Sequence, residues 1–244
     1  MDTSSEWFAT WFDTSYYHIL YKNRDYKEAQ LFMSNLVEFL KLKKDTSILD
    51  LACGKGRHSI FLNSLGYEVT GADLSKNSID FANQSKSDSL NFIVHDMRDE
   101  LQDTYHAIFS MFTSFGYFED DNEDIKVLRN IKKGLKDSDS VFVLDFLNTK
   151  KAIKNMVTKE TKIIDGIIFN INRCVENGFI IKKIEVVDDN QTFHFFERVK
   201  CLDLEKLSDF FSQVGFKIKH IIGDYNMQNF DENNSDRLIL IATK

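Results

Sequence analysis

The stretch that decides the fold is "ILDLACGKGRHSIFL", residues Ile48 to Leu62. An apolar, strand-prone run ends at Asp50, glycines follow at positions 54 and 56, and a helix-prone segment begins at Arg57. Glycine lets the backbone turn sharply and approach a ligand closely, and a helix start presents unpaired N–H groups to a negative or polar group. This order of strand, glycine turn and helix predicts a ligand site at the carboxyl end of the strand.

Strand-prone and helix-prone segments alternate on both sides of this stretch. Strands are predicted at residues 47–51, 67–72, 91–94, 106–112, 141–146, 217–222 and 238–242, and helices at 25–40, 57–65, 75–85, 121–136 and 204–214. Alternation of this kind is typical of an α/β protein with a doubly wound, mostly parallel sheet. We therefore predict a seven-stranded, Rossmann-like sheet.

The rhythm changes between residues 150 and 201. Three turn signals, Asp165-Gly166, Asn177-Gly178 and Asp188-Asp189-Asn190, separate apolar runs that favour strands. This pattern predicts an antiparallel β insertion. The prediction divides the chain into a ligand-binding domain, residues 1–149 and 202–244, and an insertion at 150–201 that serves as a substrate cap or a dimer surface.

Composition limits the class of protein. The chain has 244 residues, 43% of them hydrophobic, and a net charge of −7. An acidic balance argues against a nucleic-acid or anionic-membrane partner, and no apolar run approaches the ~18 residues of a membrane span. The N-terminus does not resemble a signal peptide, and three scattered cysteines are too few for a zinc site or a disulfide framework. These features predict a cytoplasmic protein without a metal.

Acidic residues follow the next two strands. Asp73 ends the second strand, where its carboxylate can accept the hydroxyl hydrogens of a ribose, and Asp96 follows the third, where it can accept an adenine amino group. Together they indicate a pocket for an adenosine-containing cofactor. The dinucleotide fingerprint G-x-G-x-x-G/A has Ser59 in its third small position here. That departure disfavours a nicotinamide cofactor but leaves it as an alternative.

The segment "LDLACGKGRHS" resembles the first motif of class I S-adenosylmethionine-dependent methyltransferases. The segments "VTGADLS", "FIVHDMRD", "HAIFSMFTSFGYF", "LKDSDSVFVLDFLN" and "LSDFFSQVGFKIKHI" resemble later motifs of that family, in the same order. The N-terminal "YYHILYKNRDYKEA" resembles the lead segment that covers the cofactor in its small-molecule members. The resemblance implies a Rossmann-like methyltransferase fold, S-adenosyl-L-methionine as cofactor and S-adenosyl-L-homocysteine as product.

The resemblance and the pattern together give a set of candidate site residues, with no catalytic residue and no metal ligand among them. The candidate cofactor-binding residues are Tyr21, Asp50, Ala52, Gly54, Gly56, Arg57, Asp73, Leu74, Asp96, Met97 and Phe112. The candidate substrate residues, on the insertion and on a late loop, are His194, Glu197 and Tyr225.

The predicted function is methyl transfer to a small or medium-sized acceptor by in-line displacement. Nucleic-acid amino-methyltransferases carry an Asp/Asn-Pro-Pro-Tyr/Phe motif after the fourth strand, whereas this chain reads "FTSF" at 112–115 and has no proline. A helical N-terminal lid and the insertion would enclose the acceptor. The alternatives are a nicotinamide-dependent oxidoreductase and a non-catalytic protein that binds S-adenosylmethionine. The protein is expected to be a monomer or a homodimer.

Overall fold

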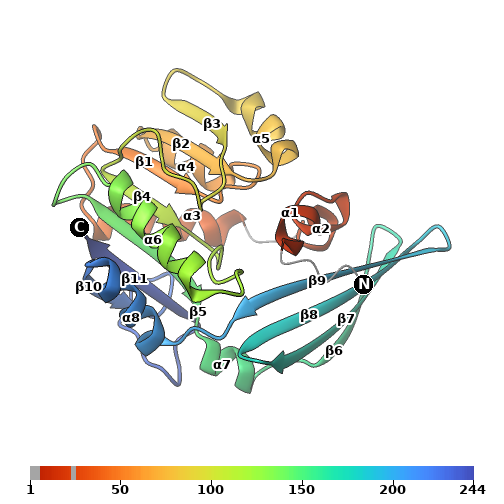
Figure 1. Cartoon of the computed structure of the whole chain (residues 1–244). Helices are drawn as coiled ribbons and strands as arrows, with labels where there is room; N and C mark the ends of the chain where they lie inside the picture. Colours follow the sequence, from red (N-terminus) through yellow and green to blue (C-terminus); the bar gives the residue numbers. More distant parts are fainter. Residues whose placement is uncertain (1–5, 23–25) are drawn as a thin grey trace.

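A seven-stranded sheet forms the centre of the computed structural model, which describes residues 6–22 and 26–244 (Figure 1). Residues 1–5 and 23–25 lie outside the described residues, and they include parts of the predicted lid and the first residue of the helix predicted at 25–40. The strand order is β10-β11-β5-β4-β1-β2-β3, with β1 to β5 parallel and β11 antiparallel to both neighbours. This order confirms the predicted doubly wound fold. The strands are β1 (Ser47–Leu51), β2 (Glu68–Asp73), β3 (Leu90–Val94), β4 (Ala107–Ser110), β5 (Val141–Leu147), β10 (Lys217–Ile222) and β11 (Arg237–Thr243).

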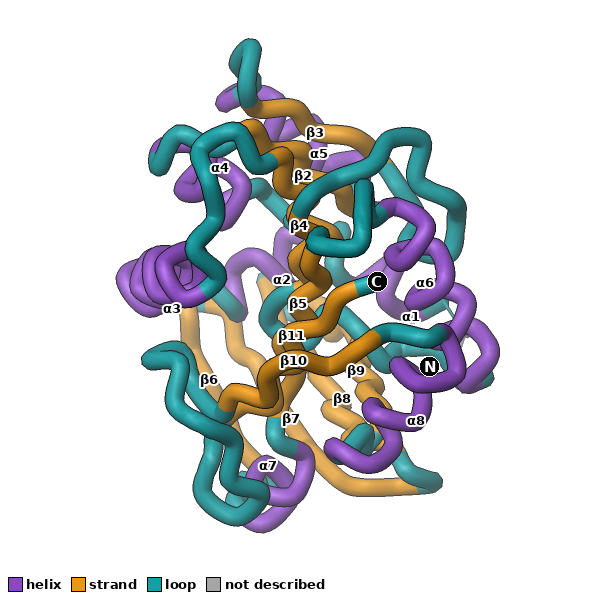
Figure 2. Tube along the Cα trace, turned by 90° about the vertical axis from the view of Figure 1, so that its left-hand side faces the viewer, coloured by secondary structure: helices purple, strands orange, loops and turns teal. Residues whose placement is uncertain are grey.

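Helices cover both faces of this sheet. Figure 2 shows α3 and α4 on one side of the sheet and α6 and α8 on the other. One face carries α3 (Tyr26–Phe39), α4 (Arg57–Ser64), α5 (Lys76–Ala82) and the short η1 (Asn83–Ser85), and the other carries α6 (Asp121–Gly134) and α8 (Leu204–Val214). Side-chain caps fix several starts: Asp203, for example, accepts the N–H of Lys206, and Gly215 ends α8 with φ +80°.

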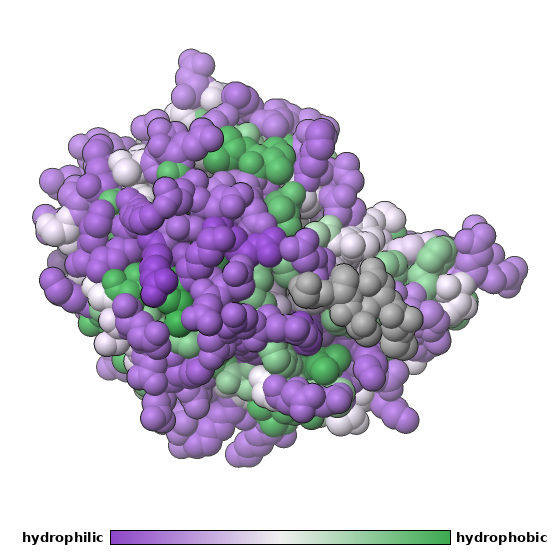
Figure 3. Space-filling model, viewed as in Figure 1, coloured by the Kyte–Doolittle hydropathy of each residue, from purple (hydrophilic) through white to green (hydrophobic). Residues whose placement is uncertain are grey.

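Two hydrophobic clusters, one on each face of the sheet, form the core. The strands β1, β4, β5 and β11 between them are almost fully buried, as a parallel sheet covered on both faces requires. By contrast, the face of the molecule in Figure 3 is mostly hydrophilic, with smaller hydrophobic areas. Burial of apolar side chains thus stabilises the sheet, and polar side chains lie at the ends of its strands.

The fourth strand is shorter than predicted. The apolar run predicts a strand at 106–112, but β4 ends at Ser110 because Phe112 and Thr113 have positive φ angles of 56° and 65°. Left-handed backbone costs a non-glycine residue roughly 1–2 kcal/mol. Such strain gathers at functional sites.

The insertion forms a separate four-stranded antiparallel sheet, in the order β6-β7-β8-β9 (Figure 1). Its strands are β6 (Lys159–Ile164), β7 (Ile167–Glu176), β8 (Phe179–Asp188) and β9 (Gln191–Lys200), preceded by a helix that the pattern did not predict, α7 (Thr149–Lys154). The three predicted turns join the strands, with positive φ at the Asp-Gly and Asn-Gly pairs. One face of this sheet contributes buried Phe169, Ile171 and Val186 to the core.

Two short N-terminal helices, α1 (Trp7–Trp11) and α2 (Ser15–Leu20), lie between the central sheet and the insertion (Figure 1). They contact both. Asp13 accepts hydrogen bonds from Ser75 and from Asn77, where α5 begins. On the other side, the Tyr16 hydroxyl donates to Asp188 of β8 at 3.0 Å. The N-terminal segment therefore bridges the two sheets.

Candidate functional site

A cavity of about 1160 Å³ lies at the carboxyl ends of the parallel strands, beneath the N-terminal helices. The loops after β1, β2, β3 and β4 all reach it, as expected at the switch point between β1 and β4. Its size is slightly above the roughly 300–1,000 Å³ of a site for one drug-sized ligand, so it has room for two molecules. The predicted site residues that line it are Tyr21, Ala52, Gly54, Arg57, Asp73, Leu74, Asp96, Met97, Phe112, Glu197 and Tyr225.

Three candidates do not line the cavity. Gly56 is the N-cap of α4 with φ +80°, and a Cβ there would come within 2.6 Å of the Phe92 ring. His194 is exposed on β9, opposite Glu185. Asp50 is fully buried behind the glycine turn, where the Ser59 hydroxyl donates to its Oδ2 at 2.6 Å. Gly56 and Asp50 therefore pack beside the glycine turn, outside the cavity.

Burial raises the pKa of the Asp50 carboxyl to about 6, although the Ser59 hydrogen bond acts in the opposite direction. The folded protein thus holds this proton more tightly than the unfolded chain, whose Asp pKa is about 3.9. The resulting stabilisation is complete below about pH 4 and is lost as the pH rises through about 6.

We expect Asp50→Asn to be more stable than the parent at pH 7.5, by up to about 2–3 kcal/mol, and to lose this advantage at pH 4.5. Thermal melts across this pH range measure the difference. Asp88→Asn, at an exposed position, is the control and should follow the parent throughout. An Asp50→Asn curve parallel to the parent's would show that Asp50 does not titrate differently on folding.

Asp73 holds the glycine turn to the second strand. Its Oδ2 accepts the N–H of Gly54 and its Oδ1 accepts the N–H of Ser75, both at 2.8 Å. Burial raises the pKa of Asp73 against the effect of these two bonds. Each carboxylate oxygen has a second lone pair, so both can still accept a hydrogen from a ligand in the cavity. Gly54 leaves the adjacent space open, with no atom within 4 Å of where its Cβ would lie.

The strained loop after β4 is fixed by a buried ion pair. Asp145 of β5 accepts the N–H of Phe112 at 2.8 Å and pairs with Arg237 Nε at 2.7 Å. Arg237 also donates to the Thr113 hydroxyl at 3.0 Å, and the Tyr225 hydroxyl donates to Asp145 at 3.2 Å. Burial, followed by the Asp145 charge, raises the pKa of Tyr225, so this phenol stays protonated. The network holds Phe112 and Thr113 at the cavity wall.

The Phe112 ring carries two basic side chains. The His58 imidazole stacks on it with centroids 4.8 Å apart and planes 5° apart, and the Arg57 guanidinium lies 4.8 Å above the ring centre. Arg57 Nε donates to His58 Nε2 at 3.1 Å. All three side chains line the cavity, so this corner presents positive and aromatic groups together.

The opposite wall joins the N-terminal segment to the insertion. Glu197 Oε1 accepts hydrogen bonds from Trp11 Nε1 at 2.9 Å and from the Tyr21 hydroxyl at 2.6 Å. Lys182 lies 3.4 Å from Glu197 Oε2 and also donates to the Tyr21 hydroxyl. Aromatic rings extend this wall, and they belong to Trp7, Phe8, Phe12, Tyr17, Tyr117 and Phe118. The predicted substrate residue Glu197 thus contacts the predicted cofactor residue Tyr21.

Sequence reasoning missed the Asp145–Arg237 pair. A carboxylate inside the apolar run "VFVLDFL" was the available signal, because a charge in a buried strand needs a partner. The identity of that partner was not readable from local pattern, since Arg237 lies 92 residues away in sequence.

Comparisons with known proteins relate this chain to methyltransferases. Residues 48–138 match a family described as "Methyltransferase domain". The chain is 25% identical to "Putative methyltransferase YqeM" of Bacillus subtilis (strain 168) over 219 residues, which cover 81% of this chain and 83% of that protein.

Solved methyltransferase structures share the fold. An S-adenosylmethionine-dependent methyltransferase from Clostridium acetobutylicum superposes with a TM-score of 0.78 at 18% identity, covering 93% of this chain and 95% of that one. The sugar N-methyltransferase KedS8 from Streptoalloteichus superposes with a TM-score of 0.72 at 16% identity, covering 93% and 92%.

The sheet order and the cavity at its strand ends are those of the class I methyltransferase fold. With the sequence matches, they identify this chain as a class I S-adenosylmethionine-dependent methyltransferase. An enzyme of this class depends on S-adenosylmethionine, and the nicotinamide-dependent alternative is not supported.

Membrane-spanning helices and metal-binding clusters are both absent from residues 6–22 and 26–244. No helix in these ranges is both long and apolar enough to cross a membrane. The same ranges contain no group of three or more His, Cys, Asp or Glu side chains placed to hold a metal ion.

Proposed function

We propose that this enzyme transfers the methyl group of S-adenosylmethionine to a small or medium-sized acceptor by in-line displacement. The observation that carries the proposal is that one cavity is lined both by the strand-end residues Gly54, Asp73 and Asp96 and by Tyr21 and Glu197 of the opposite wall. Its volume of about 1160 Å³ leaves room for an acceptor beside the cofactor. We also propose that the insertion at residues 150–201 is a substrate cap, because its Glu197 and Val199 line the cavity.

The strand-end residues fit the cofactor. The open space at Gly54 lets a ligand approach the backbone, and Asp73 retains lone pairs for the ribose hydroxyls. We place the adenine ring beside Asp96 and Met97 and the methionine carboxylate beside Arg57, because all three residues line the cavity and a guanidinium pairs well with a carboxylate. Bound S-adenosylmethionine supplies a methyl group on a positively charged sulfur.

The protein's contribution to the chemistry is position. The sulfonium charge disappears as the new bond forms, so no strong electrophile is needed, and holding nucleophile, methyl and sulfur in line supplies much of the rate. The aromatic wall excludes water and orients the acceptor. Hydrogen bonds from Trp11 and Tyr21 hold Glu197 in place. Its carboxylate can also accept a hydrogen bond from the molecule that receives the methyl group. A general base is required only where the acceptor must lose a proton.

Ring-shaped amines are the first acceptors to test, because the structural relative KedS8 is a sugar N-methyltransferase. We expect the enzyme, mixed with S-adenosylmethionine and a panel of amino sugars and cyclic amines, to release S-adenosylhomocysteine and to add one methyl group to an acceptor. Mass spectrometry measures both products. Cofactor binding without methylation of any amine, alcohol or thiol in such panels would favour a non-catalytic binding protein.

Glu197→Gln tests the acceptor wall once a panel member is methylated. We expect kcat/KM for the acceptor to fall by roughly 10–100-fold, since a hydrogen bond to a charged group is lost, with little change in S-adenosylhomocysteine affinity. His194→Gln is the matched control on the same strand and should behave as the parent, because His194 is exposed and outside the cavity. Equal kcat/KM in both variants would remove Glu197 from the acceptor site.

A further inference from the structure

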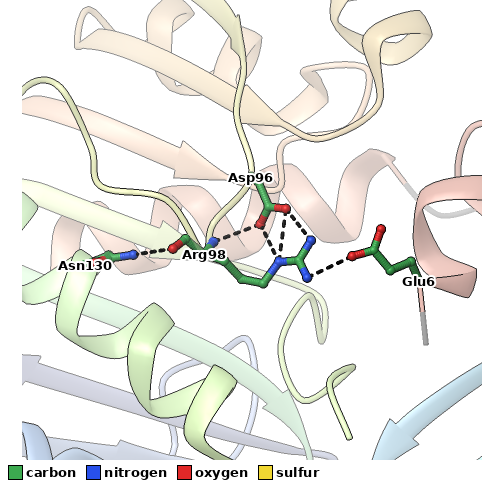
Figure 4. Close-up of polar contacts among 4 residues, drawn as sticks. All are labelled: Glu6, Asp96, Arg98 and Asn130. Atoms are coloured by element: carbon green, nitrogen blue, oxygen red, sulfur yellow. Dashed lines mark hydrogen bonds and ion pairs between the residues drawn. The ribbon is translucent and has the colours of Figure 1, made fainter. Parts of the chain in front are cut away.

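The carboxylate expected to receive adenine is already engaged by a neighbouring arginine (Figure 4). Asp96 Oδ1 accepts the Arg98 backbone N–H at 2.9 Å and Nε at 3.0 Å. Asp96 Oδ2 accepts Nε at 3.0 Å and Nη2 at 2.6 Å. This fork-shaped contact fixes the plane of the carboxylate, since two oxygens are held at once.

Arg98 is itself held from several sides. Its Nη1 pairs with Glu6 at 3.0 Å, and its backbone carbonyl accepts a hydrogen bond from Asn130 Nδ2 at 2.8 Å (Figure 4). The guanidinium lies 5.3 Å from the centre of the Phe118 ring and 5.8 Å from that of Phe8. The side chain is only 22% exposed. A guanidinium restrained in this way can hold Asp96 in one orientation.

Asp96 still faces the cavity. Its side chain is 20% exposed, and Asp96, Met97, Phe8 and Phe118 all line the cavity. An ionised carboxylate offers about four lone-pair positions. Arg98 donates three hydrogens to Asp96, because the single Nε hydrogen is shared between the two oxygens, and so one position is left for a ligand. That position can accept a hydrogen from an exocyclic amino group, but it repels a carbonyl oxygen.

We propose that Arg98 is a positioning residue that holds Asp96 as a fixed hydrogen-bond acceptor, and that it thereby makes the enzyme select adenine over hypoxanthine in its cofactor. The inference rests on the proposed placement of the adenine ring at Asp96. Without Arg98, the carboxylate can rotate, or take up a proton and donate it to an oxygen. Either change removes the selection.

The charges around Asp96 act in the same direction. Burial by itself raises the pKa of Asp96, but the hydrogen bonds and charge of Arg98 outweigh it and leave this pKa below its ordinary value. The side-chain hydrogen bonds with Asp96 raise the pKa of Arg98. Burial acts in the opposite direction but is the smaller effect. Both groups therefore remain charged at neutral pH.

Calorimetry with two probes tests the proposal. The probes are S-adenosyl-L-homocysteine and S-inosyl-L-homocysteine, which carries a carbonyl oxygen in place of the amino group. We expect the parent to bind the adenosyl probe about 10–100-fold more tightly, as for one lost hydrogen bond to a charged acceptor. In Arg98→Met this ratio should fall below about threefold, and Arg98→Lys, which keeps the charge without the fork, should give an intermediate ratio.

Glu100→Gln is the matched control, because Glu100 lies on the same loop in an exposed pair with Lys133. It should keep the parent's ratio. A purely structural role for Arg98 would weaken both probes equally, so an unchanged ratio in Arg98→Met would overturn the proposal. If Arg98→Met does not fold, an unchanged ratio in Arg98→Lys would overturn it.

The parent protein separates this inference from the function on which it rests. Binding of the adenosyl probe with a ratio near one would reject adenine recognition by Asp96 and Arg98 and leave the cofactor site intact. Absence of heat with S-adenosylhomocysteine at millimolar concentration would instead reject the cofactor site in this cavity.

Discussion

Asp145→Ala should lower the free energy of unfolding by about 3–5 kcal/mol, because it leaves the Arg237 guanidinium buried without its partner. Asp145 is completely buried and the Arg237 side chain is 18% exposed. The same substitution also removes the acceptor for the Phe112 N–H. For a chain of this size, the melting temperature should fall by roughly 6–20 °C in a thermal melt.

Two comparisons separate the buried pair from charge in general. Glu232→Ala removes one partner of the exposed Lys150–Glu232 pair and should cost about 0–1 kcal/mol. The double variant Asp145→Leu/Arg237→Met replaces both charges with apolar side chains and should recover part of the stability. If Asp145→Ala melted within a degree or two of the parent, Arg237 would have found water or another partner.

The pair also has a consequence for the site. Phe112 and Thr113 keep positive φ angles although neither is glycine, and Asp145 and Arg237 supply the bonds that hold them. When those bonds are removed, the loop can relax toward ordinary backbone angles. The Phe112 ring, which carries His58 and Arg57, would then move from the cavity wall. Stability and site geometry are thus linked through one carboxylate.

The sequence pattern predicted the fold well because the features that set helices, strands and turns act over a few neighbouring residues. The run at 47–51 is a strand with the predicted bounds, and the α4 helix starts at Arg57 as expected, since apolar periodicity, glycine and caps act within a few residues. The predicted turns of the insertion likewise follow from Asp-Gly and Asn-Gly chemistry. The end of β4 was missed because the Phe112 N–H donates a hydrogen bond to Asp145, which lies on another strand.

The candidate site was predicted in part for the same reason. Residues at strand ends, such as Gly54 and Asp73, follow from the order of parallel strands, and the structure brings them to one cavity. The partners that cross the molecule could not be read from the sequence. Glu197 and Trp11 are 186 residues apart, and no spacing rule relates them.

Asp73→Ala should weaken S-adenosylhomocysteine binding by about 30–150-fold, or roughly 2–3 kcal/mol, if Asp73 accepts the ribose hydroxyls as proposed. Charge-assisted hydrogen bonds contribute roughly 1.5–3 kcal/mol each, and water in the emptied site recovers part of the loss. Asp73→Asn should lose less, because its carbonyl oxygen can still accept one bond. Calorimetry with the product measures all three proteins.

The structure predicts that Asp73→Ala also destabilises the fold, which the sequence pattern did not indicate. From the sequence, a carboxylate at a strand end would be expected to affect stability little. Asp73 instead accepts the N–H groups of Gly54 and Ser75, so Asp73→Ala should also lower the melting temperature by a few degrees. Asp80→Ala, on the exposed side of α5 in a pair with Lys76, is the control and should change neither quantity appreciably.

The two effects of Asp73→Ala are separable because the ligand itself reports on them. If the loss of affinity came only from a loosened turn, the binding enthalpy would be nearly unchanged. If the ribose bonds are lost, the enthalpy becomes less favourable as well. An Asp73→Ala protein that folds and binds the product as tightly as the parent would remove Asp73 from the site, and with it the proposed position of the cofactor.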